Sequence, residues 1–137
     1  MAGYSKKSLV EKLGIKPGAK IAILNAPANY DTTLGPLPDG VERIEQLQAE
    51  AELDFIQFFT ASRVEFLAQF DTLKAAIKQN GMVWVSWPKK AAKVPTDLDE
   101  SVIRDIALEN GLVDVKVAAV DEVWSGLKLV YRVKDRK

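Results

Sequence analysis

The residues best suited to bind a ligand follow the expected strands of this 137-residue chain. In an open α/β sheet, ligands bind beside the carboxyl ends of the strands, so polar and aromatic side chains at these positions are the first candidates. Four segments are expected to meet at this edge: 25–27, 60–62, 87–90 and 121–125. The candidate ligand-binding residues in them are Asn25, Thr60, Ser62, Trp87, Lys89, Lys90, Asp121, Trp124 and Ser125.

A small anionic or nucleotide-like ligand is the chemistry that these residues favour. Helices expected to begin near Ser62 and Asp97 would direct unpaired backbone N–H groups toward this edge. Lys89 or Lys90 would neutralise a phosphate or carboxylate while Trp87 stacks on a ring. The competing structural interpretation, which carries more weight, is that Trp87 fills the core and both lysines are solvated.

Acidic groups and an indole fall in one expected turn over 121–125, where Asp121 could act as a base or bind a cation. Turns are rich in Asp and Ser, and a tryptophan at the start of a strand usually packs on its sheet. A structural role is therefore preferred for Asp121 and Trp124. Asn25 either donates to a ligand or caps its own turn, and both alternatives stay open.

Two residue types that dominate enzyme active sites are absent from the sequence, which contains no His and no Cys. The chain therefore lacks the commonest general base at neutral pH, the commonest metal ligand and any thiol nucleophile. No catalytic residue, cofactor or metal ligand is predicted, and a binding protein is favoured over an enzyme.

Composition indicates one globular domain over residues 1–137. Hydrophobic residues make up 47% of the chain and charged residues 28%, which suffices for one core. The 19 basic residues balance the 19 acidic ones, so no global field would attract nucleic acid or an anionic membrane. Without an apolar N-terminal stretch or a membrane-spanning segment, the expected location is the cytoplasm.

Strands and helices alternate along the chain. Apolar runs predict strands over 20–25, 53–59 and 82–87, and Ser8 and Ser62 begin capping boxes of two predicted helices. The long helix after Ser62 is expected to end at Asn80-Gly81, and a further helix to run from the cap Asp97 to Asn110-Gly111. One helical turn is expected over 30–34 within the loop 25–40.

Two further regions complete the predicted sheet. A strand is expected from residue 41, followed by a helical turn, although the sequence does not decide whether 45–52 is strand or helix. The segments 112–120 and 127–133 are expected to form an antiparallel ending. The fold class is therefore α/β, a mostly parallel sheet of about six strands with an antiparallel C-terminal strand and helices on both faces.

From residue 53 onward, the order strand, helix, strand, helix and two final strands resembles the second half of a class I methyltransferase. The segment 15–24 (IKPGAKIAIL) is similar to the lead-in to the cofactor strand of those enzymes. This resemblance implies a trimmed Rossmann-like domain, since too few residues precede 53 for a third strand and its helices. After the strand, Asn25-Ala26-Pro27-Ala28-Asn29 replaces the glycine loop, so the usual mode of adenosylmethionine binding is not expected.

A second resemblance is to a family of small bacterial proteins known as a domain of unknown function. Four strings carry it: Leu34 to Pro38 (LGPLP), Trp87 to Lys90 (WPKK), Val113 to Lys116 (VDVK) and Val120 to Gly126 (VDEVWSG). The resemblance implies a bacterial protein without an established activity.

Three hypotheses for the function follow. The first is a non-enzymatic module that binds a small anionic or nucleotide-like ligand, or a partner protein, at the carboxyl edge of the sheet. The second is an atypical group transferase with its substrate between Trp87, Lys89 and Asp121. The third is a structural or regulatory subunit that forms a homo-oligomer through an exposed strand or the hairpin that carries Trp124.

Overall fold

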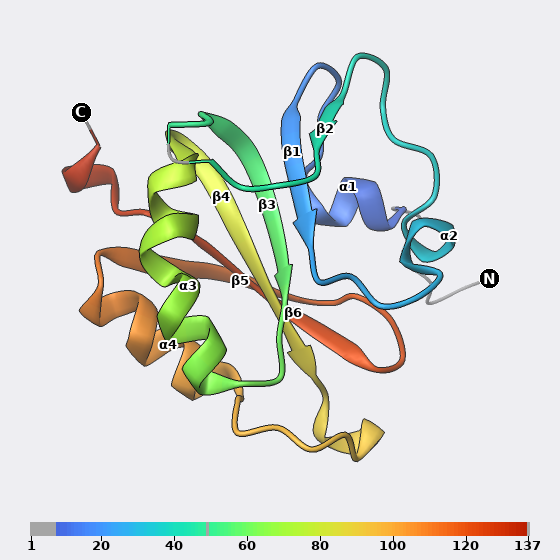
Figure 1. The fold of residues 1–137 in the computed structure, drawn as a ribbon, viewed down its shortest axis with the longest axis vertical. Coiled ribbons are helices and arrows are strands. Elements are labelled where there is room, and N and C mark those ends of the chain that lie inside the picture. The colour runs from blue at the N-terminus through green and yellow to red at the C-terminus, as the bar shows by residue number, and fades with distance from the viewer. Residues whose placement is uncertain (1–7, 49, 137) are drawn as a thin grey trace.

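The sheet is built from strands that alternate with helices along the chain (Figure 1). The computed structural model describes residues 8–48 and 50–136. Among these residues, six strands form one sheet in the order β2-β1-β3-β4-β6-β5. The strands are β1 (Lys20–Leu24), β2 (Glu42–Ile44), β3 (Leu53–Phe59), β4 (Ile77–Pro88), β5 (Leu112–Ala119) and β6 (Trp124–Tyr131).

The pairing of the strands is parallel in one half of the sheet and antiparallel in the other. β1 pairs in parallel with β2 and β3, and β3 pairs in parallel with β4. β6 lies antiparallel between β4 and β5. The predicted sheet, mostly parallel with an antiparallel C-terminal strand, is confirmed, although β6 begins at Trp124 and not at the predicted residue 127.

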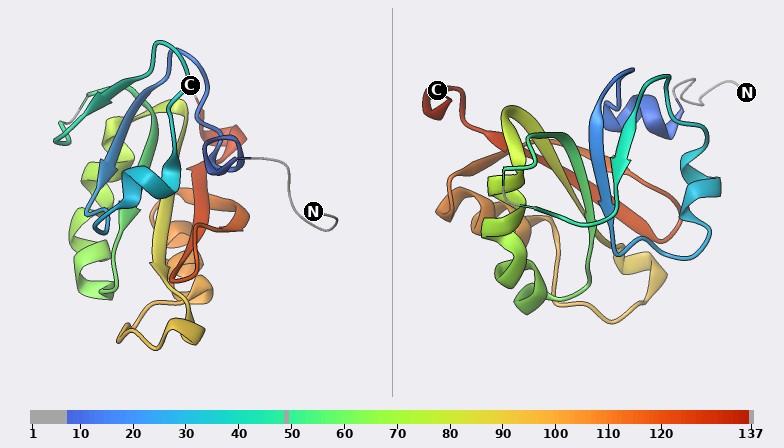
Figure 2. Two further views of the ribbon diagram at one scale, coloured as in Figure 1. Left: turned by 90° about the vertical axis from the view of Figure 1, so that its right-hand side faces the viewer. Right: turned by 45° about the horizontal axis from the view of Figure 1, so that its top comes forward.

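Helices cover both faces of the sheet, as predicted. α3 (Arg63–Ala76) and α4 (Glu100–Glu109) pack on one face, which we call the long-helix face. α1 (Leu9–Leu13) and α2 (Tyr30–Leu34) pack on the other, the short-helix face. In the left panel of Figure 2, α3 lies to the left of the strands and α1 to their right.

Each face has its own hydrophobic core because successive residues of a strand point to opposite sides. In β3, Ile56 and Phe58 belong to the core of the long-helix face, whereas Phe55 and Phe59 belong to the core of the short-helix face. β3 therefore holds the two layers together from the middle of the parallel half.

The predicted helix starts at Ser8 and Ser62 are confirmed. Ser8 and Glu11 form a reciprocal capping box, and Gly14 ends α1 with a φ of 85°. The Ser62 hydroxyl accepts the Glu65 N–H at the start of α3, but the reciprocal half of the predicted capping box is absent, because the Glu65 carboxylate accepts the Thr60 hydroxyl instead. Because these caps depend on residues three positions apart, the sequence alone is enough to locate them.

The prediction that Asn80-Gly81 ends the long helix is wrong. α3 ends at Ala76, and Ile77 already pairs with Leu53 at the start of the long strand β4. Gly81 lies inside β4, where a Cβ would stand 2.7 Å from the carbonyl oxygen of Leu53. Glycine is thus needed for close approach of two backbones and not for a helix stop.

The cap of α4 is also corrected. α4 begins after Asp99, whose carboxylate accepts the Val102 N–H at 2.9 Å. The predicted cap Asp97 instead accepts the Arg63 N–H at 2.7 Å, and so joins the start of α3 to the loop before α4. The predicted end is confirmed, because α4 stops at Glu109 and Gly111 follows with a φ of 94°.

The crossover from β2 to β3 was expected to be either strand or helix, and its described residues form neither. Residues 45 and 46 form a bend, residue 50 lies in a turn and 47, 48, 51 and 52 are irregular, so the predicted helical turn is absent from the described part of this segment. Leu47 and Ala51 pack against the core of the long-helix face. The short connection confirms the trimmed sheet, with β2 as an edge strand next to β1.

The helices described here are short. None of them combines the length and apolar character needed to cross a membrane.

Candidate functional site

The loop after β1 turns sharply at the carboxyl edge of the sheet. Asn25 and Asn29 both adopt left-handed backbone conformations, with φ values of 58° and 66°. Asparagine tolerates this region better than other residues with a Cβ, so the two asparagines make turns for which glycine is the usual choice. Between them, Pro27 offers no N–H, and its carbonyl accepts the Tyr30 N–H at the start of α2.

A hollow of about 320 Å³ opens beside this loop on the long-helix face. Apolar side chains from the end of β1, the crossover and β3 form its inner wall: Leu24, Leu47 and Phe58. Exposed polar side chains form its rim: Asn25, Gln46, Glu65 and Gln69. The hollow thus offers an apolar surface for a ring and several hydrogen-bonding groups around it.

Glu65 is the one charged residue in the lining of this hollow. The Thr60 hydroxyl donates to the Glu65 carboxylate, and the same hydroxyl accepts the Ser62 N–H at 3.1 Å. Thr60 is buried and Ser62 half-buried. These two sequence-predicted residues therefore hold the start of α3 and the position of Glu65, and neither belongs to the lining.

Trp87, Lys89 and Lys90 lie apart from the hollow. Trp87 is 7% exposed and packs in the core of the long-helix face, so its ring is not presented to a surface ligand. The Lys89 backbone N–H donates to the Val123 carbonyl at 2.8 Å, and Lys90 is exposed at the start of a short 3-10 helix, η1 (Lys90–Ala92). Trp87 therefore fills the core, as the preferred structural interpretation predicted, and the alternative anion-binding group of Trp87 with the two lysines does not come together.

The turn over 121–125 has mainly structural contacts. The Asp121 carboxylate accepts the backbone N–H groups of Val123 and Trp124, both at 2.8 Å. The Trp124 ring meets Phe59 edge to face, with 5.1 Å between centroids. Ser125 is paired with Trp87 across the β4–β6 ladder. Of the nine predicted residues, Asn25 is the one that lines the hollow.

Sequence analysis missed most of the lining. Glu65 was identified only as part of a helix cap, yet the spacing of Glu65 and Gln69 places both on one side of α3. Gln46 and Leu47 reach the hollow because the crossover packs on the long-helix face, which no local pattern shows. The Glu65–Gln69 spacing was the one available signal.

A buried polar chain fixes α2, and with it the loop after β1. The Tyr30 hydroxyl donates to Gln57 Oε1 at 2.5 Å, and Gln57 Nε2 donates to Ser86 Oγ at 3.1 Å. Gln57 and Ser86 are fully buried and Tyr30 is 2% exposed. Burial raises the pKa of the Tyr30 hydroxyl far above its usual value, so this group stays protonated and remains a donor.

Replacing Tyr30 with phenylalanine is expected to lower the free energy of unfolding by about 1–3 kcal/mol, because Gln57 Oε1 would be left buried without a donor. Urea unfolding measures this loss. Tyr131→Phe is the matched control, since the Tyr131 hydroxyl donates to the Lys74 carbonyl at 2.8 Å in a half-buried place that water can reach. Equal losses of unfolding free energy in the two variants would show that the buried hydrogen bonds of Tyr30 stabilise the protein no more than an accessible one does.

A second hollow, of about 280 Å³, lies at the opposite edge of the sheet, near Lys16, Asp54 and Met82. The Asp54 carboxylate already accepts the Lys20 N–H at 2.9 Å and pairs with Lys78 at 3.0 Å. These contacts hold the pKa of Asp54 below its usual value against the opposing effect of burial. Because ligands of open α/β sheets bind at carboxyl ends, the hollow beside Asn25 is the better candidate.

No metal site accompanies either hollow. Within residues 8–48 and 50–136, acidic side chains do not gather in a group that could hold an ion.

Known proteins resemble this chain in structure but not in sequence. No protein-family model and no curated protein matches the sequence. Solved structures do match: a complex of DhpI with SAH has a TM-score of 0.60 at 13% identity, over 92% of this chain and 83% of that one. The fold is methyltransferase-like.

Two further methyltransferase-like structures show the same relation. A putative type 11 methyltransferase from Sulfolobus solfataricus gives a TM-score of 0.60 at 14% identity, over 87% of this chain and 88% of that one. The magnesium protoporphyrin IX methyltransferase of Synechocystis with bound SAM gives a TM-score of 0.57 at 13% identity, over 90% of this chain and 74% of that one. The predicted Rossmann-like, methyltransferase-like fold is therefore confirmed.

Proposed function

We propose that the protein binds a nucleoside of the S-adenosylmethionine type in the hollow beside Asn25. The observation that carries this proposal is the combination of an apolar wall, formed by Leu24, Leu47 and Phe58, with a rim of three amides and one carboxylate. An adenine ring can be buried against such a wall while its nitrogens and the ribose hydroxyls bond to the rim.

The position of the hollow supports the same ligand. It lies beside the carboxyl ends of β1 and β3, where sheets of this kind bind ligands. Among the structures of similar fold, DhpI is complexed with SAH and the Synechocystis enzyme holds SAM. The left-handed Asn25 and Asn29 provide the sharp turn there without glycine.

The charge of the lining favours a neutral or positively charged ligand over the anionic ligand that the sequence predicted. Glu65 contributes a negative charge, and no lysine or arginine is among the lining residues. S-Adenosylmethionine carries a positive sulfonium, whereas its product S-adenosylhomocysteine carries a neutral thioether. Attraction between opposite charges in a partly desolvated site therefore favours the sulfonium form.

The proposal concerns binding, because the lining supplies no nucleophile and its one carboxylate already accepts the Thr60 hydroxyl. Group transfer is the alternative function. Transfer of a methyl group depends above all on alignment of donor and acceptor, so the lack of a general base does not remove this alternative.

Homo-oligomerisation through a free strand, the third hypothesis, is disfavoured at β5. β5 lies at the edge of the sheet, where Val115 and Val117 are 54% and 49% exposed. However, the β5–β6 register shifts between Asp114 and Lys116, so a bulge and a lysine interrupt this edge. Both features protect an edge strand from pairing with a second chain.

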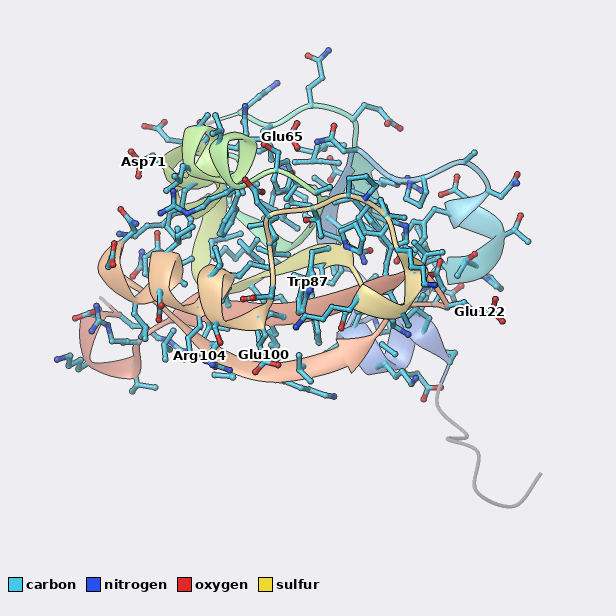
Figure 3. The ribbon with its side chains drawn as sticks, turned by 90° about the horizontal axis from the view of Figure 1, so that it is seen from below. Glu65, Asp71, Trp87, Glu100, Arg104 and Glu122 are labelled. Carbon is cyan, nitrogen blue, oxygen red and sulfur yellow. The ribbon has the colours of Figure 1, made fainter. Side chains whose placement is uncertain are left out.

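Calorimetric titration with S-adenosylmethionine and S-adenosylhomocysteine tests the proposal. Glu65→Gln keeps the shape of the side chain and removes its charge, so we expect about tenfold weaker binding of S-adenosylmethionine and a smaller loss for the thioether. Asp71→Asn is the matched control: Asp71 is also exposed on α3, and Figure 3 shows it on the opposite side of the helix from Glu65.

The proposal fails if the wild-type protein binds neither compound, or if Glu65→Gln and Asp71→Asn lose affinity equally. Incubation of the complex with candidate acceptors then separates binding from transfer, since only a transferase converts S-adenosylmethionine to S-adenosylhomocysteine.

A further inference from the structure

Two lysines face each other on the short-helix face of the sheet. In the antiparallel pairing of β5 and β6, Lys116 lies directly opposite Lys128. Directly opposed residues share one face, with their Cβ atoms about 5 Å apart. Like charges in this arrangement destabilise a sheet, so this pair of lysines lowers the stability of the folded protein.

A third lysine adds to this charge. Burial of the Lys128 side chain lowers its pKa most, and the charges of Lys116 and of Lys16, in the turn before β1, lower it further. We call Lys16, Lys116 and Lys128 the lysine cluster. Lys128 is half-buried, whereas Lys16 and Lys116 are exposed.

Within the part of the chain that the structure describes, no lysine of the cluster forms an ion pair with a carboxylate. The five ion pairs found there involve other residues, and Lys16 and Lys116 are the charged groups that act on the pKa of Lys128. Lys116 Nζ lies 3.5 Å from the Lys12 carbonyl at the end of α1, a neutral group. Mixed charges are usual on protein surfaces, and three lysines that form no ion pair with an acid depart from that rule.

The lysine cluster has a rigid support. Lys128 lies opposite Trp84 in the β4–β6 ladder, and Trp84 is fully buried in the core of the short-helix face. Trp84 Nε1 donates to the Leu13 carbonyl at 2.8 Å and so fixes the end of α1 beside the cluster. Like charges held directly opposite each other on a rigid surface break the usual pattern of a sheet, and such exceptions are typical of functional sites.

We propose that the lysine cluster binds the phosphate group of a small phosphorylated ligand. A phosphate carries up to two negative charges and accepts several hydrogen bonds, so it would bridge Lys116 and Lys128 and remove their repulsion. The site is separate from the hollow beside Asn25, because that hollow opens on the long-helix face. A nucleic-acid backbone is disfavoured as the source of phosphate, since the net charge of the chain is zero.

Thermal unfolding with pyrophosphate as the probe, at constant ionic strength, tests this site. Pyrophosphate that binds only the folded state raises the melting temperature of the wild-type protein, and the rise grows with the pyrophosphate concentration. In the double variant Lys116→Gln/Lys128→Gln, we expect this rise to be lost. Without pyrophosphate, the same variant is expected to melt at a higher temperature than the wild type, because the opposed charges are gone.

The matched control is Lys93→Gln/Lys134→Gln, which removes the same charge from two exposed lysines outside the cluster. It should keep the full pyrophosphate response. The proposal is overturned if both double variants lose the response equally, or if Lys89→Gln/Lys90→Gln alone abolishes it, which would place the anion at the carboxyl edge. Response to a DNA duplex without response to pyrophosphate would also overturn it.

Titration of the cluster variant with S-adenosylmethionine separates this inference from the proposed function. Unchanged nucleoside binding together with a lost pyrophosphate response establishes two independent sites. A pyrophosphate response that persists in the cluster variant overturns the phosphate site and leaves the hollow beside Asn25 unaffected.

Discussion

Replacing Trp84 with alanine is expected to lower the free energy of unfolding by about 3–5 kcal/mol, the largest effect of any single substitution considered for stability. Trp84 is fully buried in the core of the short-helix face. Gly126 packs against its ring so closely that a Cβ there would lie 3.0 Å from Cε3. Alanine would leave a cavity in a place where neighbouring backbone cannot collapse freely.

A second cost adds to the cavity. The Leu13 carbonyl, at the end of α1, loses its indole donor when Trp84 is replaced. α1 is a single short helix, and a helix of this length depends on tertiary contacts for its stability. We therefore expect α1 to detach from the sheet before the rest of the protein unfolds, which hydrogen exchange would detect as early loss of protection over 9–13.

Urea unfolding of Trp84→Ala and Trp124→Ala measures the contrast. Trp124 is half-buried and contacts Phe59 at the border of the same core, so its loss should be clearly smaller. Trp84→Phe removes the hydrogen bond and part of the ring but retains much of the packing, and it should fall between the wild type and Trp84→Ala. Similar losses for Trp84→Ala and Trp124→Ala would contradict the central place given to Trp84.

The parts of the fold that sequence analysis predicted correctly are those that local chemistry decides. The strand over 53–59 is rich in apolar residues because it is buried on both faces, and the Ser62 cap needs only a hydroxyl three residues before an N–H. Gly111 could be placed after α4 because its left-handed φ is a local requirement of the helix end.

The errors arise where distant residues decide the structure. Asn80-Gly81 has the composition of a helix stop, yet the pairing of Ile77 with Leu53 ends α3 earlier and draws this dipeptide into β4. Asp97 has the spacing of a cap, yet it binds the Arg63 N–H, which is remote in sequence. Neither contact can be seen in a local pattern, because each depends on how the chain folds back on itself.

The candidate site shows the same division. The carboxyl edge and Asn25 follow from the general topology of parallel sheets. Gln46 and Leu47 reach the hollow because the crossover from β2 to β3 packs on the long-helix face. Trp87 lies at the carboxyl end of β4, but the alternation of this strand turns its ring into the core. The topology of the sheet therefore predicts the edge where the candidate site lies, whereas the direction of each side chain decides which residues line the hollow.

Filling the hollow should weaken nucleoside binding strongly without harm to the fold. Gln69 is exposed on α3 and lines the hollow, so Gln69→Trp would place an indole where we propose that the adenine ring lies. Loss of roughly 100 Å² of buried apolar ligand surface costs about 2.5 kcal/mol at about 25 cal/mol per Å². This corresponds to roughly 100-fold weaker binding of S-adenosylmethionine in a calorimetric titration.

Ala75→Trp provides the control for Gln69→Trp, because Ala75 is exposed on the same helix and is not part of the lining. Both variants are expected to unfold at the urea concentration of the wild type, since each replaces an exposed residue. Only Gln69→Trp should lose the ligand. If Gln69→Trp binds S-adenosylmethionine as tightly as Ala75→Trp does, the nucleoside is bound elsewhere on the molecule, and the argument from the apolar wall of Leu24, Leu47 and Phe58 is wrong.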